Sequence, residues 1–195
     1  MNTIEHTLRL AQMAAGYWTR ALKPGYAPIR MWVEPTNTCN LKCVMCPQSS
    51  DEKPFKRGFM EFALFRKIID EAKTFVYDMN LHHTGESLLH PEMIEMIRYA
   101  KQAGIYTRMH TNATKLTEEK AKVILEAGLD FLSFSFDGFE KQTYESIRRG
   151  ANFENTLENI LNFLRMKQAQ GKRRPFTVFE VIDFSAKPGT PSGLI

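Results

Sequence analysis

Apolar and polar positions follow two periods along this chain, and segments of the two kinds alternate from one end to the other. A spacing near 3.6 residues is typical of helices with one buried face. Short apolar runs between turn signals are typical of strands. The pattern predicts helices over 4–22, 61–73, 91–103, 117–128, 140–148 and 154–170. It predicts strands over 29–36, 75–82, 105–111, 129–136 and 176–184.

Local signals support several of these helices. Thr117 has the side chain of a helix N-cap, while Gly104 and Gly128 stand where a helix C-terminus favours glycine. The first predicted helix gathers its apolar residues on one stripe, which consists of Ile4, Leu8, Ala11, Ala15 and Trp18. We therefore expect an amphipathic helix ahead of the first strand.

Helices between all the predicted strands indicate βαβ units and a parallel sheet. No G-x-G-x-x-G follows the first predicted strand, so a dinucleotide-binding fold has no support. An α/β barrel, or part of one, is the better hypothesis. Functional loops of barrels follow the carboxyl ends of the strands. In this chain those loops contain 39–46, 84–86, 111–112 and 137–138.

The fourth predicted strand has one apolar and one polar face, because side chains alternate along a strand. Its apolar residues are Leu132, Phe134 and Phe136, and its small polar residues are Ser133, Ser135 and Asp137. The second strand places Asp78, Asn80, His82 and Thr84 on one face. The polar residues suit a wall facing a bound polar cofactor. Solvent-facing positions of an antiparallel sheet are the alternative, which the intervening helices disfavour.

The composition is that of a packed globular domain: 195 residues, 43% hydrophobic and 25% charged. A net charge of +4 permits an anionic partner but does not argue for nucleic acid, and the basic run 172–174 is interpreted as a solvated loop. No apolar run is long enough for a membrane span, and no signal peptide is visible. Unpaired cysteines fit a reducing cytoplasm, so we expect a cytoplasmic protein.

The three cysteines of the chain lie within eight residues of each other, as Cys39, Cys43 and Cys46. Three thiolates on one short loop can converge on one metal centre. An iron–sulfur cluster held by three cysteines keeps one iron without a protein ligand, whereas electron-transfer clusters usually have four. The spacing C-x3-C-x2-C therefore predicts a cluster with an open iron.

A disulfide and a zinc site are the two alternatives for these cysteines. The odd count and the tight loop disfavour a disulfide. Zinc would need a fourth ligand, for which His82, His83, His90 and His110 are candidates. None of these histidines forms a regular H-x3-5-H pair with another, so the spacing favours an iron–sulfur site and leaves zinc as the alternative.

Four segments in order carry a resemblance to a known family. The cysteine loop with its approach 34–38 resembles the cluster loop of the radical S-adenosylmethionine (radical SAM) superfamily. The stretch 84–91 resembles the Gly-Gly-Glu-Pro stretch of that family after its second strand, and 111–112 and 135–138 resemble its third- and fourth-strand motifs. Accidental agreement of four motifs in family order, each at a predicted strand end, is improbable.

The resemblance implies the fold, the cofactors and the chemistry. The fold would be a parallel (β/α) partial barrel, with about five of the six strand–helix units of the family. Cys39, Cys43 and Cys46 would ligate an oxygen-sensitive [4Fe-4S] cluster whose open iron binds S-adenosylmethionine. Reductive cleavage of S-adenosylmethionine would give a 5′-deoxyadenosyl radical that abstracts hydrogen from a substrate. The reductant would be a protein such as flavodoxin or ferredoxin.

The resemblance also assigns residues to S-adenosylmethionine. These are Met45, Gly85, Glu86, Asn112, Ser135 and Asp137. Gly85 would let the backbone approach the methionine moiety, and Glu86 or a neighbouring carbonyl would accept hydrogen bonds from the ammonium group. Met45 would pack near the adenine, and Ser135 and Asp137 would serve the ribose or the methionyl carboxylate. Ordinary turn chemistry is the alternative for Gly85, Asn112 and the Asp137-Gly138 pair.

Two departures from the family pattern concern detail and extent. Thr84 stands in place of the first glycine of the Gly-Gly-Glu stretch, and Ser87 in place of its proline. The pattern divides the chain into an N-terminal helical segment 1–28, a core 29–184 and an irregular tail 185–195, interpreted as a truncation or an altered end. The barrel would then have an open edge, which a partner or a second copy would cover. The core is most similar to SPASM-type members but lacks their C-terminal cysteines.

The substrate, a peptide or a small molecule, is left open by the sequence. Candidate contacts inside the barrel are Glu34, Asn80, His82, Arg108, His110 and Glu180. An inactive or truncated iron–sulfur or zinc-binding module is the alternative function. A nucleic-acid binder is the weakest, because the charge is modest and no aromatic–basic motif is present.

Overall fold

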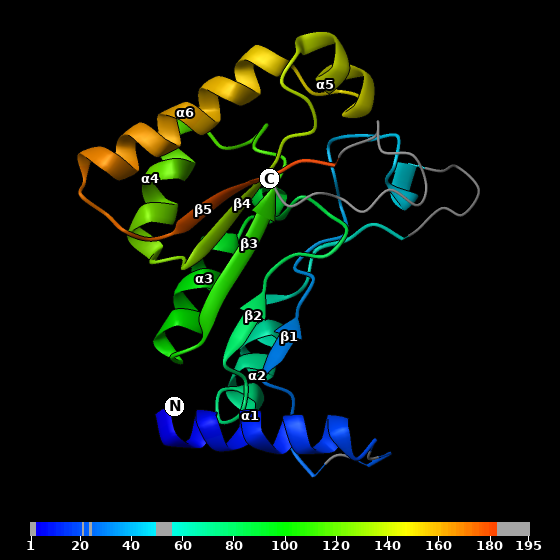
Figure 1. The fold of residues 1–195 in the computed structure, drawn as a ribbon. Helices are drawn as coiled ribbons and strands as arrows, with labels where there is room; N and C mark the ends of the chain where they lie inside the picture. The colour runs from blue at the N-terminus through cyan, green and yellow to red at the C-terminus, as the bar shows by residue number, and fades with distance from the viewer. Residues whose placement is uncertain (1–2, 21, 24, 50–55, 183–195) are drawn as a thin grey trace.

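The computed structural model describes residues 3–20, 22, 23, 25–49 and 56–182 and contains one five-stranded sheet (Figure 1). All neighbouring strands pair in parallel, in the order β1-β2-β3-β4-β5. The strands are β1 (Arg30–Trp32), β2 (Asp78–Asn80), β3 (Tyr106–Thr111), β4 (Phe131–Ser135) and β5 (Phe176–Glu180). The sequence-based expectation of a parallel α/β sheet is confirmed, and an open sheet in this order is consistent with a partial barrel.

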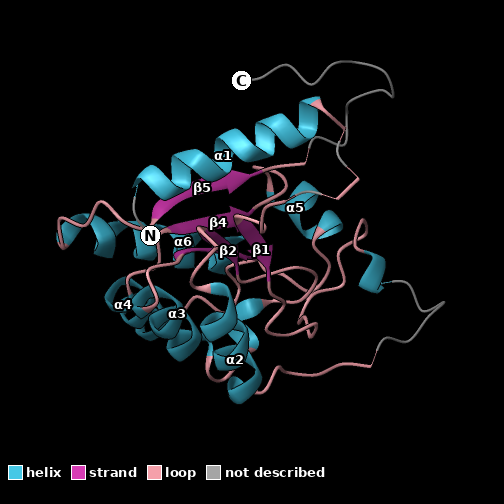
Figure 2. Cartoon of the chain, turned by 90° about the horizontal axis from the view of Figure 1, so that it is seen from below, coloured by secondary structure: helices cyan, strands magenta, loops and turns pink. Residues whose placement is uncertain are grey.

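Helices fill the connections between the strands, as right-handed parallel crossovers require. They are α2 (Phe62–Ala72), α3 (Met93–Gln102), α4 (Glu118–Ala127), α5 (Lys141–Ile147) and α6 (Phe153–Ala169), while α1 (Thr3–Trp18) precedes β1. Two short 3₁₀ turns, η1 (Pro47–Ser49) and η2 (Ser87–Leu89), lie in the loops after β1 and β2. Figure 2 shows α2, α3 and α4 side by side along one face of the sheet.

The core lies between these helices and the sheet. Leu132, Phe134 and Phe136 are fully buried there, as the alternation along the fourth strand predicts. Facing them are apolar residues of the helices, among them Phe65, Ile69, Met96, Ile97, Ile124, Ile160 and Phe163. Burial of a side chain of this size contributes roughly 1.5–3 kcal/mol, so the helical layer holds the sheet in place and leaves its other face for polar side chains.

The other face of the sheet is lined by register-matched residues. Arg108 pairs with Phe131, His110 with Ser133, and Ser135 with Glu180. Residues opposite each other in a parallel ladder point to the same side. The expected polar wall therefore exists, on the side of the sheet that α2, α3 and α4 do not cover (Figure 2).

Several strands and helices are shorter than the sequence pattern predicts. The first two strands are three residues each rather than eight, because the segments beyond them turn into loops that pack against each other. The helix predicted to start at Pro91 begins at Met93, after η2. The caps were correct: Thr117 accepts a hydrogen bond from the Lys120 amide, and Gly128 is left-handed with φ 79°. The predicted end of the fifth strand, 183–184, and the tail 185–195 lie outside the described residues.

Helix α1 lies across the amino-terminal ends of the strands, opposite the cysteine loop (Figures 1 and 2). Its polar side contacts the body, where Arg9 donates to the Thr74 carbonyl at 3.0 Å and His6 stacks on Tyr77. Its predicted apolar stripe points outward instead, with Leu8 59% and Trp18 82% exposed. The apolar residues do lie on one side of the helix, as predicted, but the polar contacts of Arg9 and His6 determine that the opposite side packs against the rest of the protein. No helix within the described ranges is both long and apolar enough to cross a membrane.

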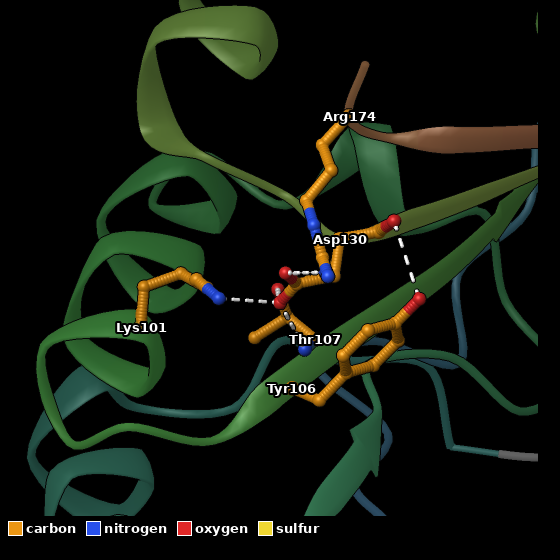
Figure 3. A network of polar contacts seen from close by, with 5 residues as sticks. All are labelled: Lys101, Tyr106, Thr107, Asp130 and Arg174. Atoms are coloured by element: carbon orange, nitrogen blue, oxygen red, sulfur yellow. Dashed lines mark hydrogen bonds and ion pairs between the residues drawn. The ribbon is translucent and has the colours of Figure 1, made fainter.

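A buried carboxylate ties the amino ends of the strands together (Figure 3). Asp130 precedes β4 and accepts hydrogen bonds from Lys101 Nζ of α3 at 2.5 Å and from the Thr107 amide of β3 at 2.9 Å. Arg174, which precedes β5, also donates to it. Helix α3, strand β3 and the approach to β5 therefore share one anion, as a buried charge requires.

Candidate active site

The cysteine loop follows β1 at the carboxyl end of the sheet and is fixed by backbone hydrogen bonds. The Lys42 amide donates to the Arg149 carbonyl at 3.0 Å, and the Val44 amide to the Ile147 carbonyl at 2.9 Å. The Cys46 amide closes a turn onto the Cys43 carbonyl at 3.0 Å. The loop is therefore held in a defined shape by the end of α5, more than a hundred residues along the chain.

The three thiols differ in burial but influence each other electrostatically. Cys43 is buried, while Cys39 and Cys46 are half-buried. Burial raises the pKa of Cys39 and Cys43, the nearby cysteines raise it further, and Arg148 opposes the shift at Cys43. Because metals bind the thiolate, such thiols lose their protons most readily when a cation supplies compensating charge. The sequence-predicted grouping of the three cysteines on one loop is what the structure contains.

The donors fit a cluster better than a single ion. No group of three or more His, Cys, Asp or Glu side chains is placed to hold one metal ion within the part of the chain that the structure describes. One zinc ion would need all its donors about 2.0–2.3 Å from one point, whereas the cysteines of a cluster bind different irons and lie further apart. The buried guanidinium of Arg148 places its Nη1 4.0 Å from Cys43 Sγ. An anionic cluster at the loop fits that buried cation.

The zinc alternative finds no fourth ligand in His90. Its Nε2 lies 2.9 Å from the Met60 carbonyl, and its Nδ1 accepts a hydrogen bond from the Glu92 amide at 3.0 Å. Both ring nitrogens are therefore engaged with backbone atoms. His82 and His110 stack on each other with ring centroids 4.3 Å apart, a parallel arrangement that suits packing rather than joint coordination.

Gly85 lies in direct contact with the start of the cysteine loop. A Cβ atom at this position would stand 2.1 Å from the Thr36 carbonyl oxygen and 2.9 Å from that of Thr38. The next amide, that of Glu86, donates to the Thr38 carbonyl at 2.9 Å. A glycine is therefore required by close approach of two backbones, which positions the loop after β2 against the loop after β1. Its expected contact with a methionine moiety stays a prediction.

The Glu86 carboxylate joins the loop after β2 to the end of β3. It is buried and accepts hydrogen bonds from the Leu88 amide at 3.1 Å, the Thr111 hydroxyl at 2.8 Å and the Asn112 amide at 2.7 Å. Burial raises the pKa of this carboxyl, and the three donors oppose the shift. With its oxygens already engaged, Glu86 orders the site, and the expected contact of Glu86 or a neighbouring carbonyl with an ammonium group stays a prediction.

Asn112 lies beside the first cysteine. Its Nδ2 is 3.9 Å from Cys39 Sγ and 3.2 Å from Asn40 Oδ1. Its Oδ1 accepts from the amide and the hydroxyl of Thr114 at 3.0 and 2.7 Å. The predicted third-strand residue is thus brought to the cysteine loop, where its amide can donate to a sulfur or to a ligand next to it.

The remaining predicted residues, Ser135, Met45 and Asp137, do not share one environment. Ser135 lies on the polar face of the sheet, opposite Glu180. Met45 is half-buried within the cysteine loop. Asp137 is buried, pairs with Arg148 at 2.7 Å and accepts from the Ile182 amide at 2.8 Å. The expected role of Asp137 at a ribose or carboxylate stays a prediction, but its oxygens already have protein partners.

Arg148 is the residue that the sequence analysis missed. It lies directly after α5, is buried, and places Nη1 4.0 Å from Cys43 Sγ. The sequence signal was weak, because Arg148 and Arg149 are adjacent and only the fold distinguishes the buried arginine from the exposed one. Tyr144 on α5 is fully buried in the same region.

The polar face of the sheet is an ordered wall of donors and acceptors. His110 Nδ1 lies 2.8 Å from Glu180 Oε2, and His82 stacks on His110. Burial, and then the neighbouring His110, lowers the pKa of His82 to about 4, so His82 is neutral near pH 7. Three buried polar atoms of this wall have no hydrogen-bond partner among the described residues: Asn80 Oδ1, His82 Nδ1 and Ser133 Oγ. Unpaired buried polar atoms are costly, and a polar ligand would satisfy them.

A hollow of about 720 Å³ lies outside the cysteine loop. Its lining includes Cys46, the exposed cations Lys42 and Arg149, and the exposed apolar side chain of Val44. The described carboxylates do not contribute to this lining. The surface next to the third cysteine is therefore positively charged and accessible.

Comparison with known sequences gives the family. A family model described as the Radical SAM superfamily matches residues 33–171. A tungsten-containing aldehyde ferredoxin oxidoreductase cofactor-modifying protein of Pyrococcus furiosus is 31% identical over 158 residues, which cover 78% of this chain and 43% of that protein. An AdoMet-dependent heme synthase of Methanosarcina barkeri is 34% identical over 136 residues, 69% of this chain and 38% of that protein. The chain thus spans about two fifths of the length of these curated relatives.

Comparison with solved structures gives the same fold. Streptococcus suis SuiB bound to S-adenosylmethionine aligns with a TM-score of 0.64 and 15% identity, over 93% of this chain and 39% of that one. The match supports the partial barrel that the sequence pattern predicts.

Proposed function

Because this chain belongs to the radical SAM superfamily, we propose that it is part of an enzyme in which Cys39, Cys43 and Cys46 ligate a [4Fe-4S] cluster beside S-adenosylmethionine. The observation that carries the proposal is the cysteine loop itself, fixed at the carboxyl end of β1 by backbone hydrogen bonds to Ile147 and Arg149. When bound, the two cofactors supply reductive cleavage of the sulfonium to a 5′-deoxyadenosyl radical, which removes a hydrogen atom from a substrate.

The protein's part in this chemistry is placement. Gly85 and Glu86 hold the loop after β2 against the cysteine loop, beside which the ammonium group of S-adenosylmethionine would bind. Asn112 offers a side-chain amide next to Cys39, and Ser135 offers a hydroxyl on the polar face. Met45 is free to pack against an apolar part of the ligand. Such preformed contacts reduce the entropy lost on binding.

The substrate that the polar wall suits best is a neutral polar molecule or a peptide. His82 is uncharged near pH 7, and the unpaired atoms of Asn80, His82 and Ser133 offer hydrogen bonds rather than net charge. Glu34 already accepts from the Thr84 amide at 2.8 Å, so it shapes the wall rather than facing a ligand freely.

Electrons would come from an acidic protein such as flavodoxin or ferredoxin. The hollow beside Cys46 combines Lys42 and Arg149 with the apolar Val44, a combination that attracts and then packs against an acidic partner. A further partner, or a second copy covering the open edge of the sheet at β5, is the other proposed contact. Phe176 and Phe179 are exposed on that strand. Exposed apolar side chains on an unpaired edge strand promote association with another chain.

The test of the proposal is anaerobic. The chain is reconstituted with iron and sulfide, reduced with dithionite and incubated with S-adenosylmethionine, and 5′-deoxyadenosine is measured by mass spectrometry. We expect product from the wild type and none from Cys43→Ala. One zinc ion per chain without sulfide would overturn the proposal in favour of a zinc-binding module. A stable cluster without cleavage would restrict the described chain to cluster binding.

A further inference from the structure

Arg148 is a buried cation placed between a cysteine and a carboxylate. Only 7% of the residue is exposed. Its Nη1 lies 4.0 Å from Cys43 Sγ, and its Nη2 lies 2.7 Å from Asp137 Oδ2. The second contact is an ion pair by distance, although its angles are too poor for a hydrogen bond. The guanidinium thus faces sulfur on one side and a carboxylate on the other.

The protein alone does not satisfy this guanidinium. Its Nε has no acceptor among the residues that the structure describes. Asp137 shares its charge, because Oδ1 accepts from the Ile182 amide at 2.8 Å. A buried charge with an unpaired N–H costs free energy unless another anion lies close. The cysteine loop meets the guanidinium at Nη1, which approaches the sulfur of Cys43.

We infer that Arg148 is a positioning residue for the cluster, and that Arg148 and Asp137 together set the charge beside Cys43. This inference rests on the proposed function, since it concerns the cluster proposed to bind there. Arg148 balances the negative charge of the cluster and its thiolates. Asp137 orients the guanidinium and partly cancels its positive charge. The potential of an iron–sulfur cluster depends on net charge and on hydrogen bonds to its sulfurs.

The two residues therefore have effects of opposite sign. A cation next to a redox centre favours the reduced, more negative form, so loss of the Arg148 charge makes the reduction potential more negative. Loss of the Asp137 charge leaves the Arg148 charge uncompensated and makes the potential less negative. Asparagine keeps the oxygen that accepts from the Ile182 amide, so Asp137→Asn changes the charge without removing that contact.

The experiment is a redox titration of the reconstituted protein, followed by electron paramagnetic resonance. Arg148→Gln should shift the reduction equilibrium about tenfold toward the oxidised form, which is 59 mV for a one-electron couple. Arg148→Lys should restore most of the shift. Asp137→Asn should shift the potential in the other direction. Arg66→Gln removes the same charge from the exposed surface of α2 and should leave the potential almost unchanged, because water screens it.

Iron and sulfide content is measured on every variant, with circular dichroism as the check of folding. If Arg148→Gln does not retain iron, the Asp137→Asn variant decides. A less negative potential than that of the wild type supports the inference, and an equal or more negative one overturns it. Equal potentials in the wild type, Arg148→Gln and Asp137→Asn would overturn it, as would shifts of the same sign in both variants. Failure of the wild type to form any cluster would instead overturn the proposed function, so the two failures are distinguishable.

Discussion

Gly85 lies so close to the carbonyl oxygen of Thr36 that a Cβ atom at position 85 would stand 2.1 Å from it. Real Cβ atoms do not approach backbone that closely, so one of the two loops must shift if position 85 carries a side chain. Those loops follow β2 and β1, and the second of them carries the cysteines. A single missing methyl group therefore connects the geometry of the second strand to the candidate cluster site.

Gly85→Ala should separate these loops. We expect a loss of about 1–3 kcal/mol in the free energy of unfolding, typical of overpacking, and a clear reduction of iron per chain after reconstitution. Urea unfolding and iron analysis measure the two effects. Gly58→Ala is the matched control, because a Cβ atom there meets nothing within 4 Å. Iron retention equal to that of the control would show that the loops adjust without consequence.

His82 should make the protein sensitive to mild acid. Its pKa is lowered to about 4 in the fold, against 6.5 for the free side chain, chiefly by burial and next by His110. The unfolded chain therefore takes up the proton first as the pH falls, and stability is lost between about pH 6.5 and pH 4. The loss is at most about 3 kcal/mol. Above pH 6.5 the contribution of His82 is constant.

The comparison variant is His82→Phe, which retains an aromatic ring against His110 and does not titrate. Free energies of unfolding at pH 7 and pH 4.5 should differ more for the wild type than for this variant. An NMR titration of the wild type should place the imidazole of His82 well below pH 6. An unshifted imidazole would contradict the buried, neutral state of this side chain.

Asp130 should matter for stability and not for the site. Asp130→Asn removes the anion shared by Lys101, Thr107 and Arg174 at the amino ends of the strands (Figure 3). We expect a cost of about 2 kcal/mol, less than for a fully buried pair because Lys101 and Arg174 reach water. Iron per folded chain should stay at the wild-type level. Thermal unfolding and iron analysis test both parts.

The control for this substitution is Asp70→Asn, which breaks an exposed pair with Lys73 on α2. An exposed ion pair contributes little, so the midpoint of unfolding should hardly move. Equal effects of the two substitutions would mean that the buried network of Asp130 is not a stability determinant.

Lys42 should affect reduction by a protein donor and not by a small uncharged photoreductant. Lys42→Glu places a negative charge in the hollow beside Cys46. The rate of reduction by flavodoxin should fall by roughly tenfold at low salt, and the difference should narrow as salt is added. Lys67→Glu on the outer side of α2 makes the same charge change away from the loop. Stopped-flow absorbance measures the rate of reduction of both variants. Equal rates would mean that the electron donor binds at another surface.

The family motifs could be predicted from the sequence because they are local. The spacing of Cys39, Cys43 and Cys46 and the alternation of Ser133 and Ser135 with Leu132 and Phe134 depend only on neighbours along the chain. The structure places the cysteines on one fixed loop and the serines on the polar face. The residues predicted to bind the cofactor also lie at the carboxyl ends of β1 to β4, but some of them have partners that the sequence did not predict. Glu86 and Asp137 engage protein atoms rather than open space.

By itself, the sequence determined the order of helices and strands, the parallel sheet and the cysteine loop, since periodicity and spacing are properties of consecutive residues. Only the tertiary structure decided which of two adjacent arginines is buried, and it brought Arg148 to Cys43 across 105 residues. It also decided that Gly85 touches the Thr36 backbone and that the apolar stripe of α1 faces outward. The physical reason is the same in each case. A pattern shows that a side chain or a backbone is suited to contact, but the folded chain supplies the partner.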